Sequence, residues 1–255
     1  MSPPPPAEVI DGCKTFIPLE NNPDVLDHLC KNLSISQDLA FHDILSTSAE
    51  FVREWYPRPC NALILLAHTP IYNAARSAIE PTIPRYEGSG PDEPVIWMKQ
   101  TIGHACGLMA LLHVVFNLEG GRYVTPGSGL DIFLKQAIQL EPTERAQLLY
   151  DSEFLEKAHM DAASRGSSTA PSPRDENHHH FLAFVRKKDG QVWELNGGMN
   201  GPLLRGTLSQ GEDLLSEEGL KITAQEFLGV AEKNGFGEMS IVAVTGADAV
   251  APGSS

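Results

Sequence analysis

"MKQTIGHACGLMALLHVVFN", residues 98–117, joins a polar, glycine-containing turn to a run of apolar residues, with Cys106 at the junction. From Ala105 to Phe116 nearly every residue is apolar or small, so a helix there would have no polar face. The stretch predicts a central, buried helix with a thiol in its first turn. Unpaired backbone N–H groups and the helix dipole stabilise a thiolate at that position, which suits a nucleophile. The alternative is a small buried core residue, as free cysteines usually are.

The residues on either side of Cys106 fit a reaction centre. Gln100, six residues upstream, offers a neutral amide donor for a developing oxyanion. Gly103 and Gly107 would let a substrate backbone approach closely. The segment "PVIWMKQ", residues 94–100, reads as a strand that leads directly into the turn.

The remaining pattern mixes strands and helices without strict alternation, which predicts an α+β fold. Asn22 and Pro23 are typical of a helix start, and Thr223 with Glu226 predicts a capping box for a later helix. Strand-like runs on both sides of Asp189-Gly190 predict a hairpin. The other predicted elements are strands in "NALILLAH" (61–68) and "MSIVAVT" (239–245) and helices in "LDIFLKQAIQL" (130–140) and "PTERAQLLY" (142–150).

Low-complexity segments delimit one expected domain at 13–246. Residues 1–12 are proline-rich and residues 247–255 are small and polar, so we expect disordered tails at both ends. Residues 151–177 are dominated by small, polar and turn-forming types in their second half and predict a long, mobile loop.

Composition narrows the class of protein. Thirty-three acidic against 19 basic side chains give a net charge of −14, which disfavours nucleic acid and favours basic partners. No apolar run is long enough for a membrane helix, and the first residues carry no signal core, so we expect a cytoplasmic protein. The four cysteines are spread without a Cys-x-x-Cys pair, which indicates free thiols.

The predicted hairpin can supply the partners that a thiol nucleophile needs, an imidazole base and a group that orients it. His180 enters one strand and Asn196 leaves the other, so their side chains would meet; the alternative is that Asn196-Gly197 is only a turn. The run His178–His180 also raises a metal site. Neighbours in a strand point to opposite faces and no cysteine is near, so we expect no metal there.

These motifs carry a family resemblance. "MKQTIGHACG", "HHFLAF" and "DGQVWELNG" resemble the ubiquitin carboxyl-terminal hydrolases, the short single-domain cysteine deubiquitinases. "FIPLENNPDVLDHL", "RPCNALILL" and "EPTERAQLLYD" extend the likeness over roughly residues 14–246. The resemblance implies a papain-like α+β fold, with a central antiparallel sheet surrounded by helices and a knotted topology. It also implies Cys106 as nucleophile, Gln100 as oxyanion donor, His180 as general base and Asn196 as orienting residue.

The chain departs from the family pattern in three places. Where the family has "ELDG", this chain has "ELNG", and an amide accepts from imidazole but does not offset its charge. His104 stands where the family generally has asparagine. The interval from His180 to Asn196 is one residue longer than expected, which we place as a bulge near "RKK"; His180 is chosen over His178 and His179 because it directly precedes "FLAF".

The expected function is hydrolysis after the carboxyl-terminal glycine of ubiquitin or a ubiquitin-like protein, through an acyl-enzyme and without metal or cofactor. The resemblance implies that Pro18, Leu19, Glu20 and the 151–177 loop contact ubiquitin, that the loop restricts adducts to small or unfolded ones, and that the enzyme is a monomer. Two other classes stay open, a module that binds ubiquitin without cutting it and a papain-type protease with other substrates.

Overall fold

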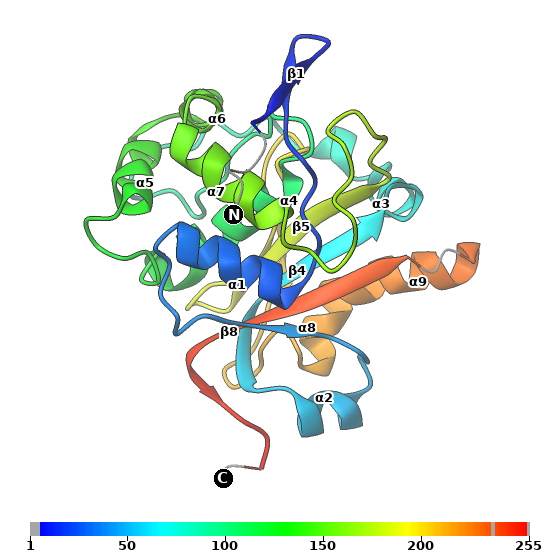
Figure 1. The fold of residues 1–255 in the computed structure, drawn as a ribbon. Coiled ribbons are helices and arrows are strands. Elements are labelled where there is room, and N and C mark those ends of the chain that lie inside the picture. Colours follow the sequence, from blue (N-terminus) through cyan, green and yellow to red (C-terminus); the bar gives the residue numbers. More distant parts are fainter. Residues whose placement is uncertain (1–5, 236–237, 254–255) are drawn as a thin grey trace.

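A six-stranded antiparallel sheet forms the centre of the protein, as shown by a computed structural model that describes residues 6–235 and 238–253 (Figure 1). Its strand order is β3-β8-β4-β5-β6-β7, and β1 and β2 form a separate hairpin. The strands are β1 Glu8–Ile10, β2 Cys13–Thr15, β3 Ala40–Asp43, β4 Arg58–His68, β5 His179–Arg186, β6 Gln191–Leu195, β7 Leu203–Thr207 and β8 Met239–Val250. The helices are α1 Pro23–Asn32, α2 Ala49–Trp55, α3 Thr69–Arg76, α4 Cys106–Asn117, α5 Gly129–Gln139, α6 Pro142–Tyr150, α7 Glu153–Ala163, α8 Glu217–Ile222 and α9 Ala224–Asn234, with short 3-10 turns at Glu80–Thr82 and Leu118–Gly120.

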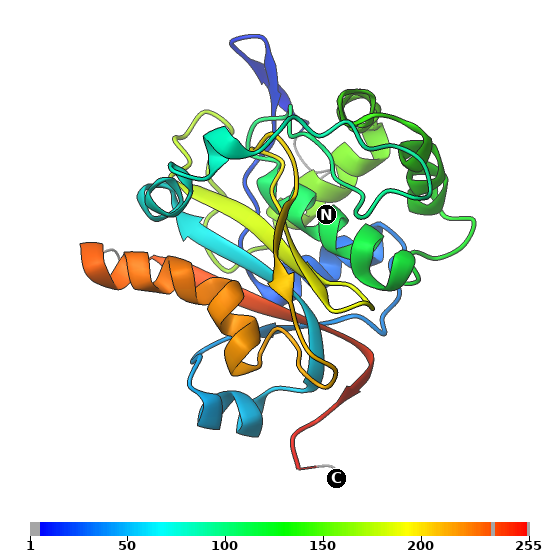
Figure 2. The same ribbon diagram turned by 180° about the vertical axis from the view of Figure 1, so that it is seen from behind.

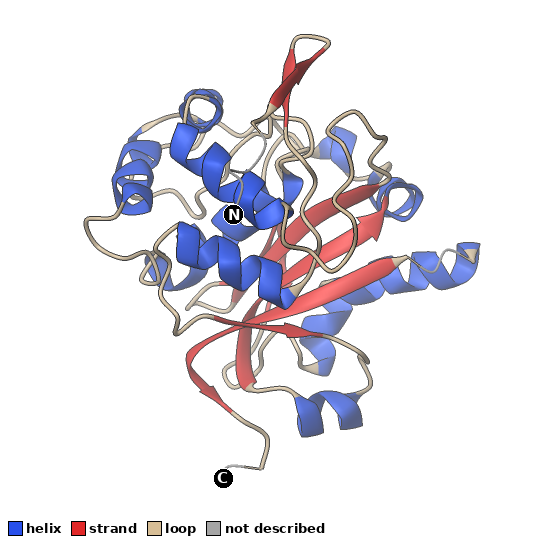
Figure 3. Ribbon diagram, in the orientation of Figure 1, coloured by secondary structure: helices blue, strands red, loops and turns tan. Residues whose placement is uncertain are grey.

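Helices cover both faces of the sheet (Figure 3). Alternate residues of the central strand β4 enter different cores: Ile64 packs with α1, α4 and α5, whereas Leu63 and Leu65 pack with α3, α8 and α9. The view from behind shows α8 and α9 on the second face (Figure 2). Burial on both faces explains why β4 reads as a continuous apolar run. The expected α+β fold with a central antiparallel sheet among helices is confirmed, and the knotted threading stays a prediction.

The helix that begins at Cys106 is the most buried element of the fold. Every residue of α4, from Cys106 to Asn117, is buried. The helix packs mainly on β5, and it carries no side-chain cap at its start, where Ala105 is the N-cap. The prediction of a central helix with the thiol in its first turn is therefore confirmed.

The predicted hairpin is also present and keeps a regular register. Residues of β5 and β6 pair from Ala183 with Leu195 to Arg186 with Val192 without a shift. The chain turns through residues 187–190, where Gly190 donates to Lys187 at 2.9 Å. The additional residue expected near "RKK" lies in the turn. Lys187 donates to Gln191 at 2.8 Å, and Gly190 has φ of +86°, which is the geometry of a three-residue loop closed by a glycine bulge.

Residues 94–100 are extended but belong to no strand of the described sheet, which corrects the prediction made for them. Their backbone groups are satisfied mainly by side chains. Asn117 of α4 bonds both the N–H and the C=O of Ile96, at 2.7 and 2.8 Å, and His113 of α4 accepts from the N–H of Met98 at 3.0 Å. An apolar, alternating segment therefore looks like a strand in the sequence, although its partners are polar side chains of a buried helix.

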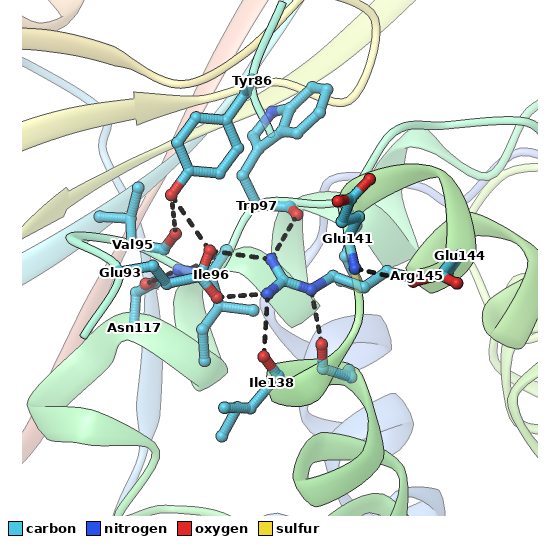
Figure 4. A network of polar contacts seen from close by, with 12 residues as sticks. Tyr86, Glu93, Val95, Ile96, Trp97, Asn117, Ile138, Glu141, Glu144 and Arg145 are labelled. Atoms are coloured by element: carbon cyan, nitrogen blue, oxygen red, sulfur yellow. Dashed lines mark hydrogen bonds and ion pairs between the residues drawn. The ribbon is translucent and has the colours of Figure 1, made fainter. Parts of the chain in front are cut away.

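A buried ion pair fixes the same segment from its other side (Figure 4). The guanidinium of Arg145 is fully buried and pairs with Glu93, and it also donates to the carbonyl of Trp97 at 3.1 Å. Its remaining N–H groups bond the last carbonyls of α5, at Ala137 and Ile138. Because a buried charge is costly unless it is paired and fully hydrogen-bonded, these contacts hold residues 93–97 rigidly against α5 and α6.

Three further predictions need correction. The predicted loop at 151–177 begins with helix α7, so the irregular segment is 164–178. Thr223 does not cap α9 through its side chain, since its hydroxyl donates backward to Gly219 at 2.6 Å.

The predicted tails are shorter than 1–12 and 247–255. Glu8–Ile10 pairs with β2, and β8 continues to Val250. Residues 1–5 and 254–255 of those tails lie outside the described residues. Within the described ranges, no helix combines the length and apolar character that crossing a bilayer requires.

Candidate active site

Cys106 lies at one end of a pocket of about 250 Å³, where the first turn of α4 meets the start of β5 and the first turns of α3. The pocket lining includes Gln100, His104, Tyr72 and His180. Cys106 is 4% exposed, so it lines the pocket as an almost fully buried residue.

The thiol of Cys106 is electrostatically prepared to ionise. Burial alone disfavours the thiolate, but a hydrogen bond and charge interaction with His180 and the backbone N–H groups of Phe181 and Gly107 outweigh it, and the pKa of Cys106 falls below its ordinary value. Gly107 follows Cys106 in the first turn of α4, so its N–H is one of the helix's unpaired donors. Buried Cys30 and Cys60 have the opposite environment, and burial raises the pKa of each, that of Cys60 to about 12.

His180 connects the thiol to Asn196. Burial disfavours its imidazolium, but contacts with Cys106 and then Asn196 raise the pKa of His180 above its ordinary value. Its Nε2 lies 2.8 Å from Asn196 Oδ1. An amide oxygen only accepts, so Nε2 carries the proton and Nδ1 is left to serve Cys106. The two opposite pKa shifts favour a thiolate–imidazolium pair near neutral pH.

Asn196 is buried directly after β6 and uses both ends of its amide. Besides His180, its oxygen accepts from the N–H of Gly198 at 2.8 Å, and its Nδ2 donates to the hydroxyl of Tyr72 at 2.9 Å. The Tyr72 ring packs on the His180 imidazole with 4.7 Å between centroids. Burial raises the pKa of Tyr72 to about 12, so the phenol stays neutral. Asn196 is therefore more than a turn residue.

Gln100 lines the same pocket as Cys106 and His180. One N–H of its amide donates to Ile102 O at 3.0 Å, while the buried Oε1 has no hydrogen-bond partner among the described residues. The primary amide carries a second N–H, which is available to a ligand in the pocket. Its backbone N–H donates to Gly197 O at 2.9 Å, which joins the segment of Gln100 to the turn after Asn196.

Two more side chains strengthen that junction. Trp97 Nε1 donates to the carbonyl of Asn196 at 3.0 Å, and Lys99 Nζ donates to the carbonyls of Gly198 and Met199 at 3.0 and 2.8 Å. Hydrogen bonds thus connect residues 97–100 to residues 196–199, although the two segments are distant in the sequence.

A buried ion network fixes the same region from α3. Arg76 and Glu194, both fully buried, form two hydrogen bonds of 2.8 and 2.6 Å, and Arg76 also pairs with Glu226 of α9 at 3.0 Å. Glu194 precedes Asn196 by two residues, so it points to the same face of the hairpin. The network sets the distance between α3 and the end of β6.

The glycines beside Cys106 have a different role from the one expected. A Cβ at Gly103 would lie 2.7 Å from Thr15 Oγ1, and one at Gly107 would lie 2.9 Å from Leu19 Cδ1. The chain's own segment at 15–19 occupies the space that was assigned to a substrate backbone. His104 between them has φ of +57°, a conformation in which asparagine and histidine are both enriched among non-glycine residues, so the departure from asparagine is compatible with the backbone.

The residues expected to contact ubiquitin line a second pocket of about 310 Å³, which lies between residues 18–20 and the 164–178 segment. Leu19 is buried against the start of α4, whereas Pro18 and Glu20 are partly exposed. The carboxylate of Glu20 accepts from Ser167 Oγ at 2.6 Å and from the N–H of Ser168 at 3.3 Å. In this state Glu20 holds the loop.

The other histidines of the 178–180 run have acidic partners, and His179 also lines the pocket of Cys106. His179 pairs with Glu238 at 3.0 Å and His178 with Glu176 at 3.4 Å. The structure brings together Cys106, His180, Asn196 and Gln100, and it adds Tyr72, which the sequence did not reveal. A tyrosine one turn before a buried arginine on a short helix carries no motif, and only the packing of α3 places it.

The family model described as ubiquitin carboxyl-terminal hydrolase, family 1, matches residues 16–228. A ubiquitin carboxyl-terminal hydrolase of Aplysia californica is 33% identical over 194 residues, which cover 76% of this chain and 87% of that protein. A probable ubiquitin carboxyl-terminal hydrolase of Dictyostelium discoideum is 35% identical over 191 residues, 74% of each chain. Isozyme L1 of the hydrolase from Equus caballus is 31% identical over 205 residues, 80% of this chain and 88% of that one.

A solved structure shares the fold. The catalytic domain of Trichinella spiralis UCH37, crystallised with ubiquitin vinyl methyl ester, superposes with a TM-score of 0.64. The match covers 91% of this chain and 95% of that domain at 19% sequence identity. At this identity the likeness concerns the architecture.

Proposed function

Because the chain belongs to family 1 of the ubiquitin carboxyl-terminal hydrolases, and is thereby a cysteine-type deubiquitinase, we propose that it cleaves the bond after the carboxyl-terminal glycine of ubiquitin with Cys106 as nucleophile. The observation that carries the proposal is the continuous contact from the Cys106 thiol to His180 and from His180 to Asn196. A ubiquitin-like protein is the alternative substrate of the same chemistry.

The first half of the reaction transfers the ubiquitin acyl group to the enzyme. The Cys106 thiolate adds to the glycine carbonyl carbon, and a thioester forms as the bond to the leaving amine breaks. The imidazolium of His180 gives its proton to that amine. The free N–H of Gln100, together with the Cys106 backbone N–H, holds the oxyanion, an effect worth about 3 kcal/mol for a single donor.

The second half returns the enzyme to its starting state. Neutral His180 takes a proton from water, and the resulting hydroxide equivalent adds to the thioester carbonyl. The C–S bond then breaks and releases the Cys106 thiolate and the carboxylic acid of ubiquitin, which gives its proton to water. The proton that His180 gained restores the imidazolium beside the thiolate. Asn196 holds Nε2–H throughout, so Nδ1 remains the nitrogen that exchanges protons.

We assign the binding of the ubiquitin tail to the pocket between residues 18–20 and 164–178. Glu20 would exchange its serine partners for a basic group of the substrate, and the net charge of −14 suits a basic tail. A chain segment over the entrance admits a thin tail and excludes a bulky folded adduct, so small or unfolded leaving groups are the expected substrates. One protomer holds every proposed catalytic group, which agrees with action as a monomer.

Ubiquitin with an electrophile at its carboxyl terminus tests the proposal. We expect a covalent adduct of one ubiquitin per chain that is absent in Cys106→Ala, and Cys60→Ala is the matched control because Cys60 is a buried thiol of another core. Tight but reversible association without an adduct would assign the chain to ubiquitin binding alone. No association, with cleavage of other peptides, would assign it to a different protease class.

A further inference from the structure

Two residues one turn apart on α3 contact Glu194 near the end of β6 and Asn196 directly after it. Arg76 bonds Glu194 through two hydrogen bonds, and Tyr72 accepts from Asn196 at 2.9 Å. Residues i and i+4 share a helix face, and residues i and i+2 share a strand face, so the two contacts form parallel rungs between the same elements. The buried ion pair therefore fixes the height at which the Tyr72 hydroxyl reaches Asn196.

The amide of Asn196 has one orientation that serves His180. The N–H of Gly198 can only donate, so the atom that faces it, 2.8 Å away, must be the amide oxygen. The same oxygen faces His180 Nε2, and the NH2 group must then find an acceptor on the side of α3. Tyr72 Oη is the acceptor there. Without it, a buried donor would be left unpaired, which is unfavourable.

On the basis of the proposed function, we propose that Tyr72 is a positioning residue, through which the amide of Asn196 can orient His180 as the third member of the triad. Its hydroxyl keeps Asn196 Oδ1 on His180 Nε2, and its ring, 4.7 Å from the imidazole, keeps the ring plane of His180 fixed. If the amide rotated, its NH2 would face Nε2, the proton would move to Nδ1, and Nδ1 would no longer accept the thiol proton.

This role belongs to an amide and not to a carboxylate. Both oxygens of an aspartate accept, so rotation of the group would leave His180 with the same partner, and the negative charge would hold the imidazolium as well. The dependence on the Tyr72 hydroxyl should therefore be large with Asn196 and small with an aspartate at that position.

A double-mutant cycle between Tyr72→Phe and Asn196→Asp tests the proposal. Ubiquitin with a carboxyl-terminal fluorogenic amide gives kcat and KM from pH 5.5 to 10, and iodoacetamide gives the rate of Cys106 alkylation over the same range. We expect Tyr72→Phe to lower kcat about tenfold with little change in KM and to move the alkaline limb of the kcat profile to lower pH. Alkylation follows the thiolate and does not fall at high pH, so its onset should move to higher pH as the imidazolium is held less firmly. In the Asn196→Asp background, the same change should lower kcat by only about twofold.

Two further variants separate the hydroxyl from general packing. Tyr72→Leu removes the ring as well and should lower kcat beyond Tyr72→Phe. Tyr123→Phe is the matched control, because Tyr123 is a buried tyrosine whose hydroxyl donates to Glu119 at 2.9 Å on another part of the fold. It should leave both pH profiles in place even if it lowers the melting temperature.

Tyr72→Phe with unchanged profiles, or with the same loss in both backgrounds, would overturn the positioning role. That result is distinct from failure of the proposed function, in which the unaltered enzyme neither hydrolyses the ubiquitin amide nor forms the covalent adduct. The alkylation profile needs no ubiquitin and reports on Cys106, His180 and Asn196 in either case.

Discussion

The imidazole of His113 accepts a hydrogen bond of 3.0 Å from the backbone N–H of Met98. His113 lies two turns after Cys106 on α4, and Met98 lies two residues before Gln100. Burial lowers the pKa of His113 to about 3, so its Nε2 stays an acceptor. The helix that carries the proposed nucleophile thus also contacts the segment that carries the proposed oxyanion donor, in addition to the contacts from Arg145 and from residues 196–199.

This arrangement predicts the effect of removing the Gln100 amide. Gln100→Ala should lower kcat/KM by roughly 10² to 10³, the usual loss for one oxyanion donor, with little change in KM. Alkylation of Cys106 should keep its pH profile, since the amide does not contact His180. Gln147→Ala, an exposed glutamine on α6, is the control and should retain full activity. A loss below threefold for Gln100→Ala would remove the residue from the mechanism.

A carboxylate at position 196 should strengthen the ion pair between the Cys106 thiolate and the His180 imidazolium. Asn196→Asp adds a negative charge beside His180 and raises the pKa of the imidazole further, so the thiolate–imidazolium pair persists to higher pH. We expect the alkaline limb of kcat/KM to move upward and turnover at neutral pH to stay equal or rise. Steady-state kinetics on a ubiquitin amide measure both. A large loss of turnover would contradict the orienting role of Asn196.

Lengthening the 164–178 segment should broaden the range of adducts. An insertion of about ten Gly and Ser residues between Ser168 and Thr169 enlarges the entrance, while loop closure costs only a fraction of a kcal/mol more. We expect cleavage of ubiquitin from a folded protein, at unchanged rates for a small amide. The same insertion after Gly127, in an exposed turn, is the control. Equal selectivity of the two insertion variants would exclude the segment as a size filter.

Acid should destabilise the fold through buried histidines. His159 is fully buried and its Nε2–H donates to Ile17 O at 2.7 Å, and burial lowers its pKa to about 4. In the unfolded chain the pKa of His159 has its ordinary value of about 6.5. Between about pH 6.5 and 4 the unfolded chain therefore binds a proton at His159 that the folded chain does not bind. The free energy of unfolding should then fall by about 1.4 kcal/mol for each pH unit from about 6.5 down to about 4.

His159→Gln keeps a donor for Ile17 and removes this titration, so its unfolding free energy should depend less steeply on pH in that window. Urea unfolding at pH 7, 6 and 5 measures the slope, which does not depend on the absolute stability of the variant. His178→Gln alters an exposed histidine and should keep the original slope. Parallel slopes for His159→Gln and the unaltered protein would disprove the assignment. His113 also lowers the free energy of unfolding as the pH falls, and its effect extends to about pH 3, because burial lowers its pKa to about 3.

The buried helix, the strand at 61–68 and the hairpin follow from local patterns, and the structure confirms them. Helix α7 has a recognisable signal in the sequence: Ser152 caps it, and Leu155, Ala158 and Ala162 share its buried face. The small and polar residues that follow it concealed this signal. The segment at 94–100 could not be distinguished from a strand, because its apolar alternation says nothing about whether Asn117 and His113 or another strand bond its backbone.

The site was predictable to the extent that motifs carry it. Cys106, Gln100, His180 and Asn196 stand in recognisable spacing. The first three line one pocket, and Asn196 contacts His180 from beneath the surface. The contact of Tyr72 with Asn196 depends on how α3 docks on the sheet, and the buried Arg76–Glu194 pair determines that docking. Such a relationship arises from tertiary packing, and a single sequence contains no local trace of it.

Strand β8 lies between β3 and β4 in the sheet and pairs with both of them. During synthesis, Cys106, His180 and Asn196 all leave the ribosome before this strand does, so a nascent chain carries every reactive group while its sheet is still in two parts. β4 and β8 are far apart in the sequence, and pairing strands over such a long separation is entropically slow. A nascent chain from which β8 has not yet emerged therefore lacks the strand that joins β3 to β4 and the rest of the sheet.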